Sequence, residues 1–435
     1  MLITKQLLKD ELTQLREQGV GVASLEPAVA AARAEDQDSL QSLYRQLQEL
    51  PGDGVLDAAE PSTLDEILPL RPQGPRRIAS AWSADRLLDR ILGAWLGRAA
   101  GCLLGKPCEG WHHTEIRAYL DPAGAYPLDD YFPQVLPEPE GAPSAAGKPA
   151  SWLRGGVVAG PRDDDTDYTI LGLYLLEKHG PSFTTEDVAA AWLSCLPYWQ
   201  VYTAERVAYA NLVNGLHAPD TATHHNPYRE WIGAQIRADM WGYVCPGRPE
   251  QAAELAYRDA RLSHVRNGIY GEMWAAACIA AAFAEREPRT VIEAGLSEIP
   301  HDCRLAQALR RTMDWCASDP DWETTWQRVA RDYGHYHGVH TINNACAVAL
   351  ALLHSGGDFE RAVTIAVMCG WDTDCNGATV GSIVGAALGA RALPAKWVTP
   401  LNDTLHSAVQ GFEVNRISDL ARRTLVQAQR QMKDA

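Results

Sequence analysis

Apolar residues recur along this chain at the three- and four-residue spacing of helices, and the alternation typical of strands is almost absent. The stretch DRLLDRILGAWLGRAAGCLLG, for example, is helix-like and becomes rich in glycine toward its end. The pattern predicts an all-α fold. The expected helices cover residues 2–18, 26–50, 85–105, 166–178, 186–215, 250–261, 268–286, 303–317, 341–354, 358–369, 376–392 and 403–430.

The N-terminal part of the chain is separated from the rest by a proline-rich stretch. Residues 2–18 predict an amphipathic helix, and 26–50 predict a second one with a stripe of leucines. The segment LPLRPQGPRR, residues 68–77, has the composition of a linker. We therefore divide the chain into an N-terminal helical module, 1–75, and a main, catalytic domain, 76–435. The module is expected to be a helical hairpin, and its leucine stripe suits packing on the main domain, as a lid for example, or a dimer contact.

Two further patterns bear on the shape of the main domain. Residues 121–156 contain many prolines, glycines and acids and predict a long loop, which is often a functional lid in a compact domain. Small residues at close helical spacing let two helix backbones approach each other. The last helix to carry such a pattern has Gly377, Gly381, Gly385 and Gly389.

The charge balance excludes several classes of partner. The 435 residues contain 39 Lys and Arg against 55 Asp and Glu, a formal net charge of −16. Such a chain repels nucleic acid and anionic membranes, so we expect neither as a partner. No uncharged apolar run reaches about 18 residues, the length that spans a membrane, and the first residues do not resemble a signal peptide. Ten cysteines without a C-x-x-C spacing suggest a reducing, cytoplasmic compartment.

Two groups of acids stand where the chain enters apolar helices, PRDDDTDYTILGLYLL at 161–176 and GWDTDCNGATVGSIVGAALGA at 370–390. Like charges within about 4 Å repel by around 1 kcal/mol even in bulk water, and a helix N-terminus stabilises only one or two of them. Carboxylates with a hydroxyl suit a hard cation. The pattern favours a shared site for two metals, although two ordinary capped helices remain the alternative. The candidate ligands are Asp163, Asp164, Asp165, Thr166, Asp372 and Asp374.

Three motifs in this order resemble the ADP-ribosylglycohydrolase family: LGAWLGRAAGCLLGKPCEG at 92–110, DDDT at 163–166 and GWDTDCNGATVGSIVGA at 370–386. The resemblance covers about residues 88–392. It implies an all-α orthogonal multi-helix bundle that holds two Mg²⁺ ions, with Mn²⁺ as a substitute. It also implies cleavage of an N- or O-glycosidic bond at the anomeric carbon of an ADP-ribose.

The same resemblance implies roles for individual residues. Glu109, Asp165 and Asp372 are the expected catalytic residues. The stretch RLSHVRNGIYGEMWAAACIAAAF, which contains His264 and Gly268, looks like the family's helix start that contacts the ligand. Two further expectations come from side-chain chemistry alone: the Trp371 ring suits stacking on a base, and His340 with Asn343 or Asn344 could offer hydrogen bonds to a sugar or base. Alternatives for the histidines at 335–340 are a plain loop or a zinc site.

The chain departs from the family pattern at both metal motifs. Asp163 stands where the family usually has Thr, and Cys375 stands where the second motif usually has Thr. A thiol is a poorer Mg²⁺ ligand than a hydroxyl. Either Asp163 takes over a ligand position, or one metal site, with Cys375 as a ligand, is weakened or selects a softer ion. Trp371 in place of a glycine adds a bulky ring beside the second motif.

Together these observations predict a Mg²⁺-dependent glycosidase. Its substrate would be a small ADP-ribose-type ligand or an ADP-ribosylated protein, and it would act as a monomer or homodimer. One alternative is a hydrolase of a small nucleoside-like or specialised-metabolite glycoside. A second is a non-catalytic ADP-ribose sensor that has lost a metal, and a third is a dimetal phosphoesterase.

Overall fold

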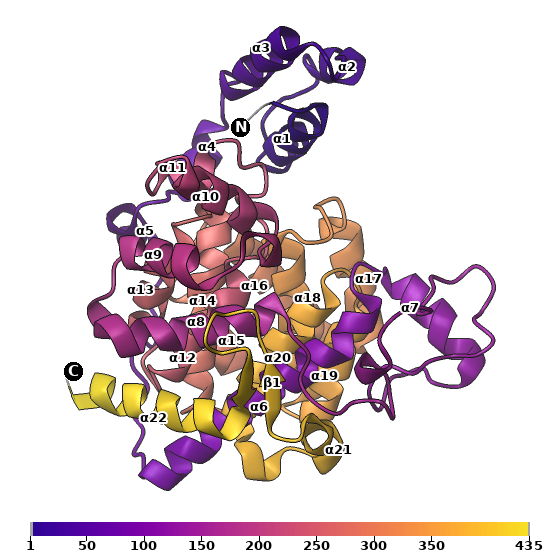
Figure 1. Ribbon diagram of the computed structural model, residues 1–435, viewed down its shortest axis with the longest axis vertical. Helices are drawn as coiled ribbons and strands as arrows, with labels where there is room; N and C mark the ends of the chain where they lie inside the picture. Colours follow the sequence, from indigo (N-terminus) through magenta and orange to yellow (C-terminus); the bar gives the residue numbers. More distant parts are fainter. Residues whose placement is uncertain (1–2, 434–435) are drawn as a thin grey trace.

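The computed structural model describes residues 3–433, and these residues form an almost purely helical bundle (Figure 1). The N-terminal helices are α1 (Lys5–Glu17), α2 (Glu26–Ala31), α3 (Gln37–Gln48), α4 (Gly54–Ala59) and α5 (Leu64–Leu70). Then follow α6 (Ala84–Gly105), α7 (His113–Leu120), α8 (Asp164–His179), α9 (Thr185–Cys195), α10 (Thr203–Val213), α11 (Asp220–Thr223), α12 (Asp239–Tyr243), α13 (Pro249–Ala260) and α14 (Arg266–Ala282). The last helices are α15 (Pro288–Leu296), α16 (Arg304–Ser318), α17 (Trp322–Tyr333), α18 (Thr341–Ser355), α19 (Phe359–Met368), α20 (Thr373–Leu388), α21 (Ala395–Val398) and α22 (Ile417–Lys433).

Sheet structure within the described residues is limited to one antiparallel hairpin, β1 (Thr404–His406) and β2 (Val414–Arg416). The all-α prediction is therefore confirmed. The predicted helix over 403–430 is wrong in its first half, because left-handed backbone at Asn402 and Asp403 turns the chain into the hairpin before α22 begins. The predicted helix over 186–215 is interrupted as well. Pro197 disfavours helical backbone at the residue before it, so α9 ends at Cys195 and α10 starts anew.

Helices α6 and α20 form the central pair of the bundle, packed through their glycines. A methyl group on Gly93 would lie 2.5 Å from the carbonyl oxygen of Gly385, and Gly97 and Gly101 are equally tight against the α20 backbone. The glycines of α20 thus allow the close approach that the sequence predicts. As a consequence, the C-terminal end of α6 lies directly beside the N-terminal end of α20, where a methyl on Gly105 would collide with Thr373.

The first three helices form a small unit at the edge of the molecule, above α10 and α11 in Figure 1. They have an apolar core of their own, made of residues such as Leu8, Leu40 and Leu47, whereas Ile67 in α5 already belongs to the main core. The predicted single helix over 26–50 is in fact α2 and α3. Asp36 caps α3 by accepting from the Ser39 N–H (3.1 Å), so a new helix starts there. The division of the chain at residue 75 stays a prediction.

The segment 121–156 is irregular apart from short 3₁₀ turns, as its composition indicates. Tyr131 and Phe132 anchor it in the main core. Among residues 3–433, no helix combines the length and the apolar character needed to cross a membrane. All ten cysteines lie in this range, and each is a free thiol.

Candidate active site

The two acidic segments, about 200 residues apart in sequence, meet in space at the ends of three helices. Donor atoms of Glu109, Asp372 and Asp374 lie within 4.8 Å of one another. Asp374 also belongs to a second group of this kind, in which its partners are Asp165 and Cys375. The C-terminal end of α6 and the N-terminal ends of α8 and α20 therefore build one acidic centre.

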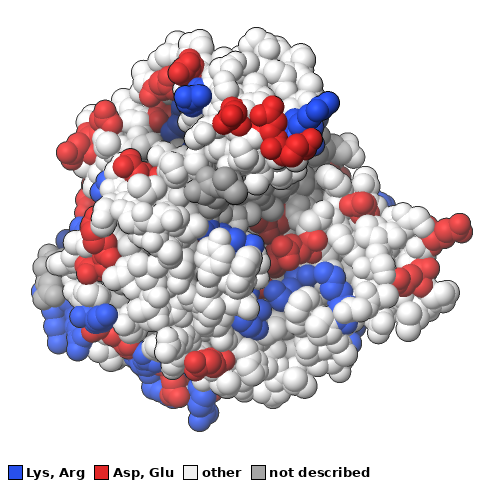
Figure 2. Space-filling view, turned by 45° about the horizontal axis from the view of Figure 1, so that its top comes forward, with Lys and Arg blue, Asp and Glu red and all other residues white. Residues whose placement is uncertain are grey.

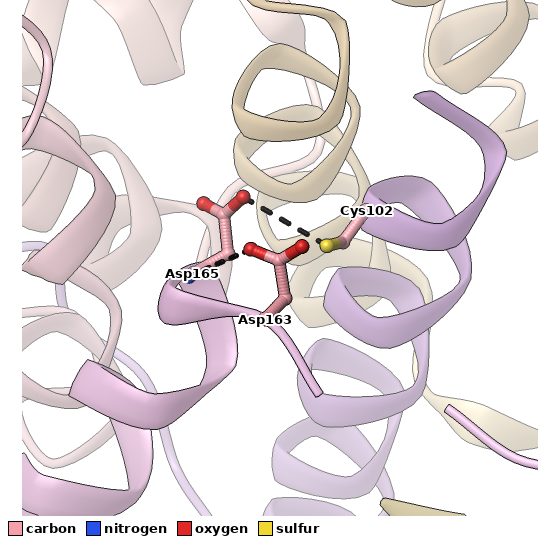
Figure 3. A group of neighbouring side chains, drawn as sticks. All are labelled: Cys102, Asp163 and Asp165. Carbon is pink, nitrogen blue, oxygen red and sulfur yellow. Dashed lines mark hydrogen bonds between the residues drawn. The ribbon is translucent and has the colours of Figure 1, made fainter. Parts of the chain in front are cut away.

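A third group of donors joins α6 to α8, as Figure 3 shows with Cys102, Asp163 and Asp165. Asp163 is the N-cap of α8, and its Oδ1 accepts from the Asp165 N–H at 3.1 Å. The Cys102 thiol lies 3.8 Å from Asp165 Oδ2. Thr166 donates its hydroxyl to the Asp163 carbonyl (3.1 Å), within the same capping turn. The capping pattern therefore accounts for the local structure, while leaving several carboxylates crowded together.

Two cations lie among these acids. Arg98 is fully buried, donates from Nη2 to Asp165 Oδ1 (3.1 Å) and forms an ion pair with Asp239, with Nη1 2.7 Å from Oδ2. Lys106 forms an ion pair with Asp163. Burial alone would raise the pKa of Asp163, but the Lys106 ammonium, together with the Asp165 N–H and Arg162, holds that pKa below its ordinary value. Asp163 is therefore the acid of this centre whose charge is best compensated by the protein itself.

The remaining acids lack enough positive charge. Burial, reinforced by neighbouring carboxylates, raises the pKa of Asp164 and Asp374 well above the ordinary value. The pKa of Asp372 is raised as well, mainly by burial. Partial withdrawal from solvent and repulsion by Asp372 and Asp163 raise the pKa of Glu109 to about 7, although this residue still exposes surface. The centre as a whole therefore favours an additional cation or bound protons.

Asp374 provides the most direct sign that a cation fits here. Its side chain is 4% exposed, and its Oδ1 is buried without any hydrogen-bond partner. A buried polar atom without a partner is costly, and a metal ion removes that cost. The group of Glu109, Asp372 and Asp374 offers only oxygen donors, as Mg²⁺ prefers. The other two groups each include a thiol, from Cys102 or Cys375, and suit a hard cation less well.

The acidic centre opens into a cavity of about 340 Å³. This volume lies in the range of small-molecule sites. In Figure 2, acidic side chains occupy the recess near the centre of the face, with Lys and Arg side chains on either side of it. The cavity combines acids, two cations and three large aromatic rings. Its lining includes Lys106, Glu109, Trp152, Arg162, Asp163, Asp164, Tyr202, Glu205, Trp231, Ile232, Val339, Asp372, Asp374 and Cys375.

His264 and Gly268, two expected substrate contacts, lie behind the cavity wall. His264 is fully buried, with its Nδ1 at 2.8 Å from the Ser263 hydroxyl and its Nε2 at 4.0 Å from Glu205 Oε1. Glu205 lines the cavity itself. Gly268 lies in the first turn of α14, where a methyl group would be 2.6 Å from the Arg229 carbonyl oxygen. In this arrangement His264 does not line the cavity itself but lies behind Glu205, which does.

His340 and Asn343 are also buried beside the cavity, and neither is among the residues that line it. The His340 ring stacks on Tyr336 with centroids 4.5 Å apart, and its Nδ1 accepts from the Ile342 N–H at the start of α18. Asn343 donates to the His337 carbonyl at 3.2 Å. Both residues therefore stabilise the loop that presents Val339 to the cavity.

Trp371 is not among the residues that line this cavity, and it lines a separate pocket with His113 and Trp326. Its φ of +65° is unusual for a bulky residue. The backbone is held in this conformation because Trp371 donates to the Trp111 carbonyl (2.8 Å) and accepts from the Gly110 N–H (2.9 Å). The ring packs edge-on against Trp326 at 4.4 Å. Strained backbone next to a site often serves function, and here it ties the Asp372 loop to the Glu109 loop.

Sequence patterns did not predict several of the cavity residues. Lys106 and Arg162 each stand within three residues of an acid in the motifs, and this proximity in sequence could have identified them. Arg162 donates to Asp167 Oδ2 at 2.8 Å, which explains the fourth aspartate of that segment as a structural residue. Glu205 and Trp231 come from separate segments, and no local pattern marks them.

A helical bundle whose helix ends bring carboxylates to a single cavity is an arrangement suited to a hydrolase. The chain belongs to the ADP-ribosylglycohydrolase family, whose model matches residues 83–434. Membership in this family indicates a glycohydrolase that acts on substrates of the ADP-ribosyl type.

The comparisons with solved structures support the fold. One is described as an ADP-ribosylglycohydrolase-related protein complex. It matches with a TM-score of 0.51 at 20% sequence identity, over 79% of this chain and 99% of its own. No curated protein matches the chain in sequence. Residues 1–82 lie outside the family match.

Proposed function

We propose that this protein is a Mg²⁺-dependent glycosidase that hydrolyses the bond at C1′ of an ADP-ribosyl substrate. The observation that carries the proposal is the meeting of Glu109, Asp372 and Asp374 within 4.8 Å, with a buried, unpartnered oxygen on Asp374. Family membership supports the reaction class, and the all-oxygen donor set supports a hard cation.

Two ions are the expected complement, with Mn²⁺ able to replace Mg²⁺. Asp372 and Asp374 would hold them together with Glu109 and the acids at the start of α8, Asp163, Asp164 and Asp165, with Thr166 and Cys375 as further candidates. When bound, such ions supply Lewis acidity and lower the pKa of a coordinated water. Because Arg98 already pairs with Asp165, and Lys106 with Asp163, we expect the α20 side of the centre to bind the metal more tightly.

Glu109 is the residue best suited to move a proton. In the metal-free centre, burial and repulsion by Asp372 and Asp163 raise its pKa to about 7. When it does not itself coordinate an ion, such a carboxylate can take a proton from the attacking water and return one to the leaving group. In the reaction, the water oxygen bonds to C1′, the glycosidic bond breaks, and the leaving nitrogen or oxygen receives the proton. Positive charge develops at C1′ in the transition state. The carboxylate of Asp372, which lines the cavity, would stabilise it directly, and that of Asp165, which pairs with Arg98 behind the lining, from farther away.

The other cavity residues suit the remainder of an ADP-ribose. Lys106 lies 4.8 Å from the centre of the Trp152 ring, and Arg162 lies 5.8 Å from that of Tyr202. These cations suit phosphate oxygens, and the aromatic rings suit a base. A cavity of about 340 Å³ holds only part of an ADP-ribose. This volume is therefore compatible with a small ADP-ribose-type ligand and with the modified side chain of a protein.

A non-catalytic ADP-ribose sensor is the second candidate. It is favoured by the thiols of Cys102 and Cys375, which occur in two of the three donor groups and bind Mg²⁺ poorly. Binding of ADP-ribose without turnover would identify it.

The test is the release of free ADP-ribose from ADP-ribosyl-arginine by the purified protein with Mg²⁺ and, in parallel, with EDTA. We expect turnover only with the metal. Asp372→Ala and Asp374→Ala should each lower kcat at least 100-fold, a loss of about 3 kcal/mol in transition-state stabilisation, and should lower metal content measured by plasma mass spectrometry.

Asp38→Ala, which removes an exposed acid from α3, is the matched control and should change neither quantity. Full activity and full metal content in Asp372→Ala would contradict the proposal. Release of inorganic phosphate would indicate a phosphoesterase, and turnover of a nucleoside alone would indicate a small-glycoside hydrolase.

A further inference from the structure

Helix α1 lies outside the family match and buries an unusual set of polar side chains. Glu11 and Gln14 are almost fully buried, and Glu17 and Gln18 are each 7% exposed. Acids and amides are seldom buried unless they are paired. The first three helices have their own apolar core, which is separate from the main one. The unit formed by residues 3–50, the N-terminal unit, is thus joined to the bundle through polar groups, and such contacts fix a position more than they add stability.

The carboxylate of Glu230 is the centre of this polar contact. It is fully buried, and on the side of α1 its Oε1 accepts from Gln14 Nε2 (3.1 Å) and Gln18 Nε2 (2.9 Å). On the side of the bundle, its Oε2 accepts from Asn267 Nδ2 (2.8 Å) and Arg304 Nη2 (3.0 Å). Two elements therefore share a single buried charge, and neither can shift without leaving part of it unpaired.

Two neighbouring contacts repeat the pattern. Arg229 donates to Glu11 Oε2 (3.0 Å) and Gln18 Oε1 (3.1 Å). The His337 N–H donates to Glu17 Oε1 at 2.6 Å. Apart from a hydrogen bond from Arg304 to the Glu17 carbonyl, these polar contacts of α1 fall on two short segments of the bundle, one ending at Glu230 and the other starting at His337.

Both segments continue directly into the wall of the cavity. Trp231 and Ile232 follow Glu230, Val339 follows His337, and all three line the cavity. We call these three residues the hydrophobic wall. The backbones of the two segments are hydrogen-bonded to each other, because the Ile232 N–H donates to the Val339 carbonyl at 2.9 Å. The Trp231 ring also stacks on His337 with centroids 4.1 Å apart.

We propose that the N-terminal unit is a positioning element that holds the hydrophobic wall in place and thereby sets the affinity of the cavity for its ligand. The hydrogen bonds from α1 immobilise the residues next to the wall on both of its segments. The choice of ADP-ribose as the test ligand rests on the function proposed above. The claim that α1 holds the hydrophobic wall in place does not depend on that function.

Amide hydrogen exchange on the full-length protein tests the link. In the double variant Gln14→Ala/Gln18→Ala, Glu230 keeps its partners in the bundle, so the fold should be retained, as judged by circular dichroism. We expect the amides of Ile232 and Thr341, which donate across the paired segments to the carbonyls of Val339 and Glu230, to exchange at least tenfold faster, because local opening becomes easier. The matched control is Lys9→Ala, on the exposed face of α1. Should the double variant not fold, Gln18→Ala alone should show a smaller increase.

Isothermal titration with ADP-ribose and Mg²⁺ then tests the consequence for binding. The double variant should bind about tenfold more weakly than wild type, in line with the loss of hydrogen bonds to a charged group, and Lys9→Ala should bind like wild type. The proposal is overturned if these two amides exchange in the double variant at the same rate as in Lys9→Ala. It is also overturned if they exchange faster but the affinity of the double variant for ADP-ribose equals that of wild type. If wild type does not bind ADP-ribose, the proposed function falls, and exchange at the two amides still decides whether α1 holds the wall.

Discussion

Asp163 and Lys106 show how a single ion pair can alter an acidic centre. The lysine compensates the charge of Asp163, whereas among residues 3–433 Asp164, Asp372 and Asp374 form no ion pair, and the pKa of each is raised. The charge that a metal must supply is therefore concentrated toward α20 and Glu109. The acids were predictable from sequence because they stand at the N-termini of apolar helices. Which of them have their charge balanced by a cation was not, because that depends on side chains at and near α6, far away in sequence.

The raised pKa of Glu109 leads to a prediction about stability. Between pH 4.5 and about 7 the folded, metal-free chain keeps a proton on Glu109 that the unfolded chain releases. The unfolded state therefore binds fewer protons, and this contribution lowers the free energy of unfolding as the pH rises through that window. Glu109→Gln removes the effect. In EDTA, the variant should match wild type near pH 4.5 and become the more stable of the two by pH 7.5.

Urea unfolding at a series of pH values measures this difference. Glu186→Gln, an exposed glutamate in the first turn of α9, serves as the control and should not change the pH dependence. Mg²⁺ should stabilise wild type more than Glu109→Gln. If the difference in free energy of unfolding between Glu109→Gln and wild type did not vary with pH, the result would argue against a raised pKa of Glu109.

Glu205 permits a test that separates binding from packing. Its Oε1 accepts from the buried Arg237 at 2.7 Å, and Asp259 Oδ2 accepts from the same arginine at 3.0 Å. Only Glu205 lines the cavity. Glu205→Gln should raise KM for ADP-ribosyl-arginine about tenfold with a smaller change in kcat, as expected for a lost charged hydrogen bond to the substrate. Asp259→Asn should lower thermal stability without raising KM, and equal KM values in the two variants would remove Glu205 from the binding site.

At the scale of elements, the contact between α6 and α20 determines where the acids stand. Because glycines face glycines along this contact, the two backbones lie close together, and the helix ends deliver Glu109 and Asp374 to the same place. The sequence indicated the close approach through the regular glycines of α20. It did not indicate the partner helix, since pairing over nearly 300 residues of chain leaves no local pattern.

A single methyl group in this contact should therefore be costly. Gly101→Ala would place its Cβ against the carbonyl of Gly377, and two backbones cannot give way as a flexible side chain can. We expect a loss of about 2 kcal/mol or more in the free energy of unfolding, because overpacking exceeds the gain in helix propensity. Gly54→Ala in α4, where the added methyl meets nothing within 4 Å, should be neutral or slightly stabilising. Chemical denaturation of both variants makes the comparison, and equal stabilities would contradict the packing argument.

For the whole molecule, sequence patterns predicted the helical fold, most long helices of the bundle and the convergence of the acidic segments. They failed where tertiary contacts decide the outcome, as in the hairpin at 404–416. The expected substrate contacts at His264, His340 and Trp371 stay predictions. In the structure these side chains lie beside or behind the cavity, where they support Glu205, Val339 and the Asp372 loop. A motif or a side-chain type can predict which part of the fold a residue belongs to, and packing decides whether its side chain faces the ligand.

The most direct test of the account is anomalous diffraction from a crystal of this protein soaked in Mn²⁺, because it locates bound metal independently of any assay. The account predicts anomalous peaks in the acidic centre, the strongest within bonding distance of the carboxylates of Asp372 and Asp374, with a second toward Asp163 and Asp164. A crystal that shows no peak between these two acidic segments, or metal bound only elsewhere on the surface, would contradict it.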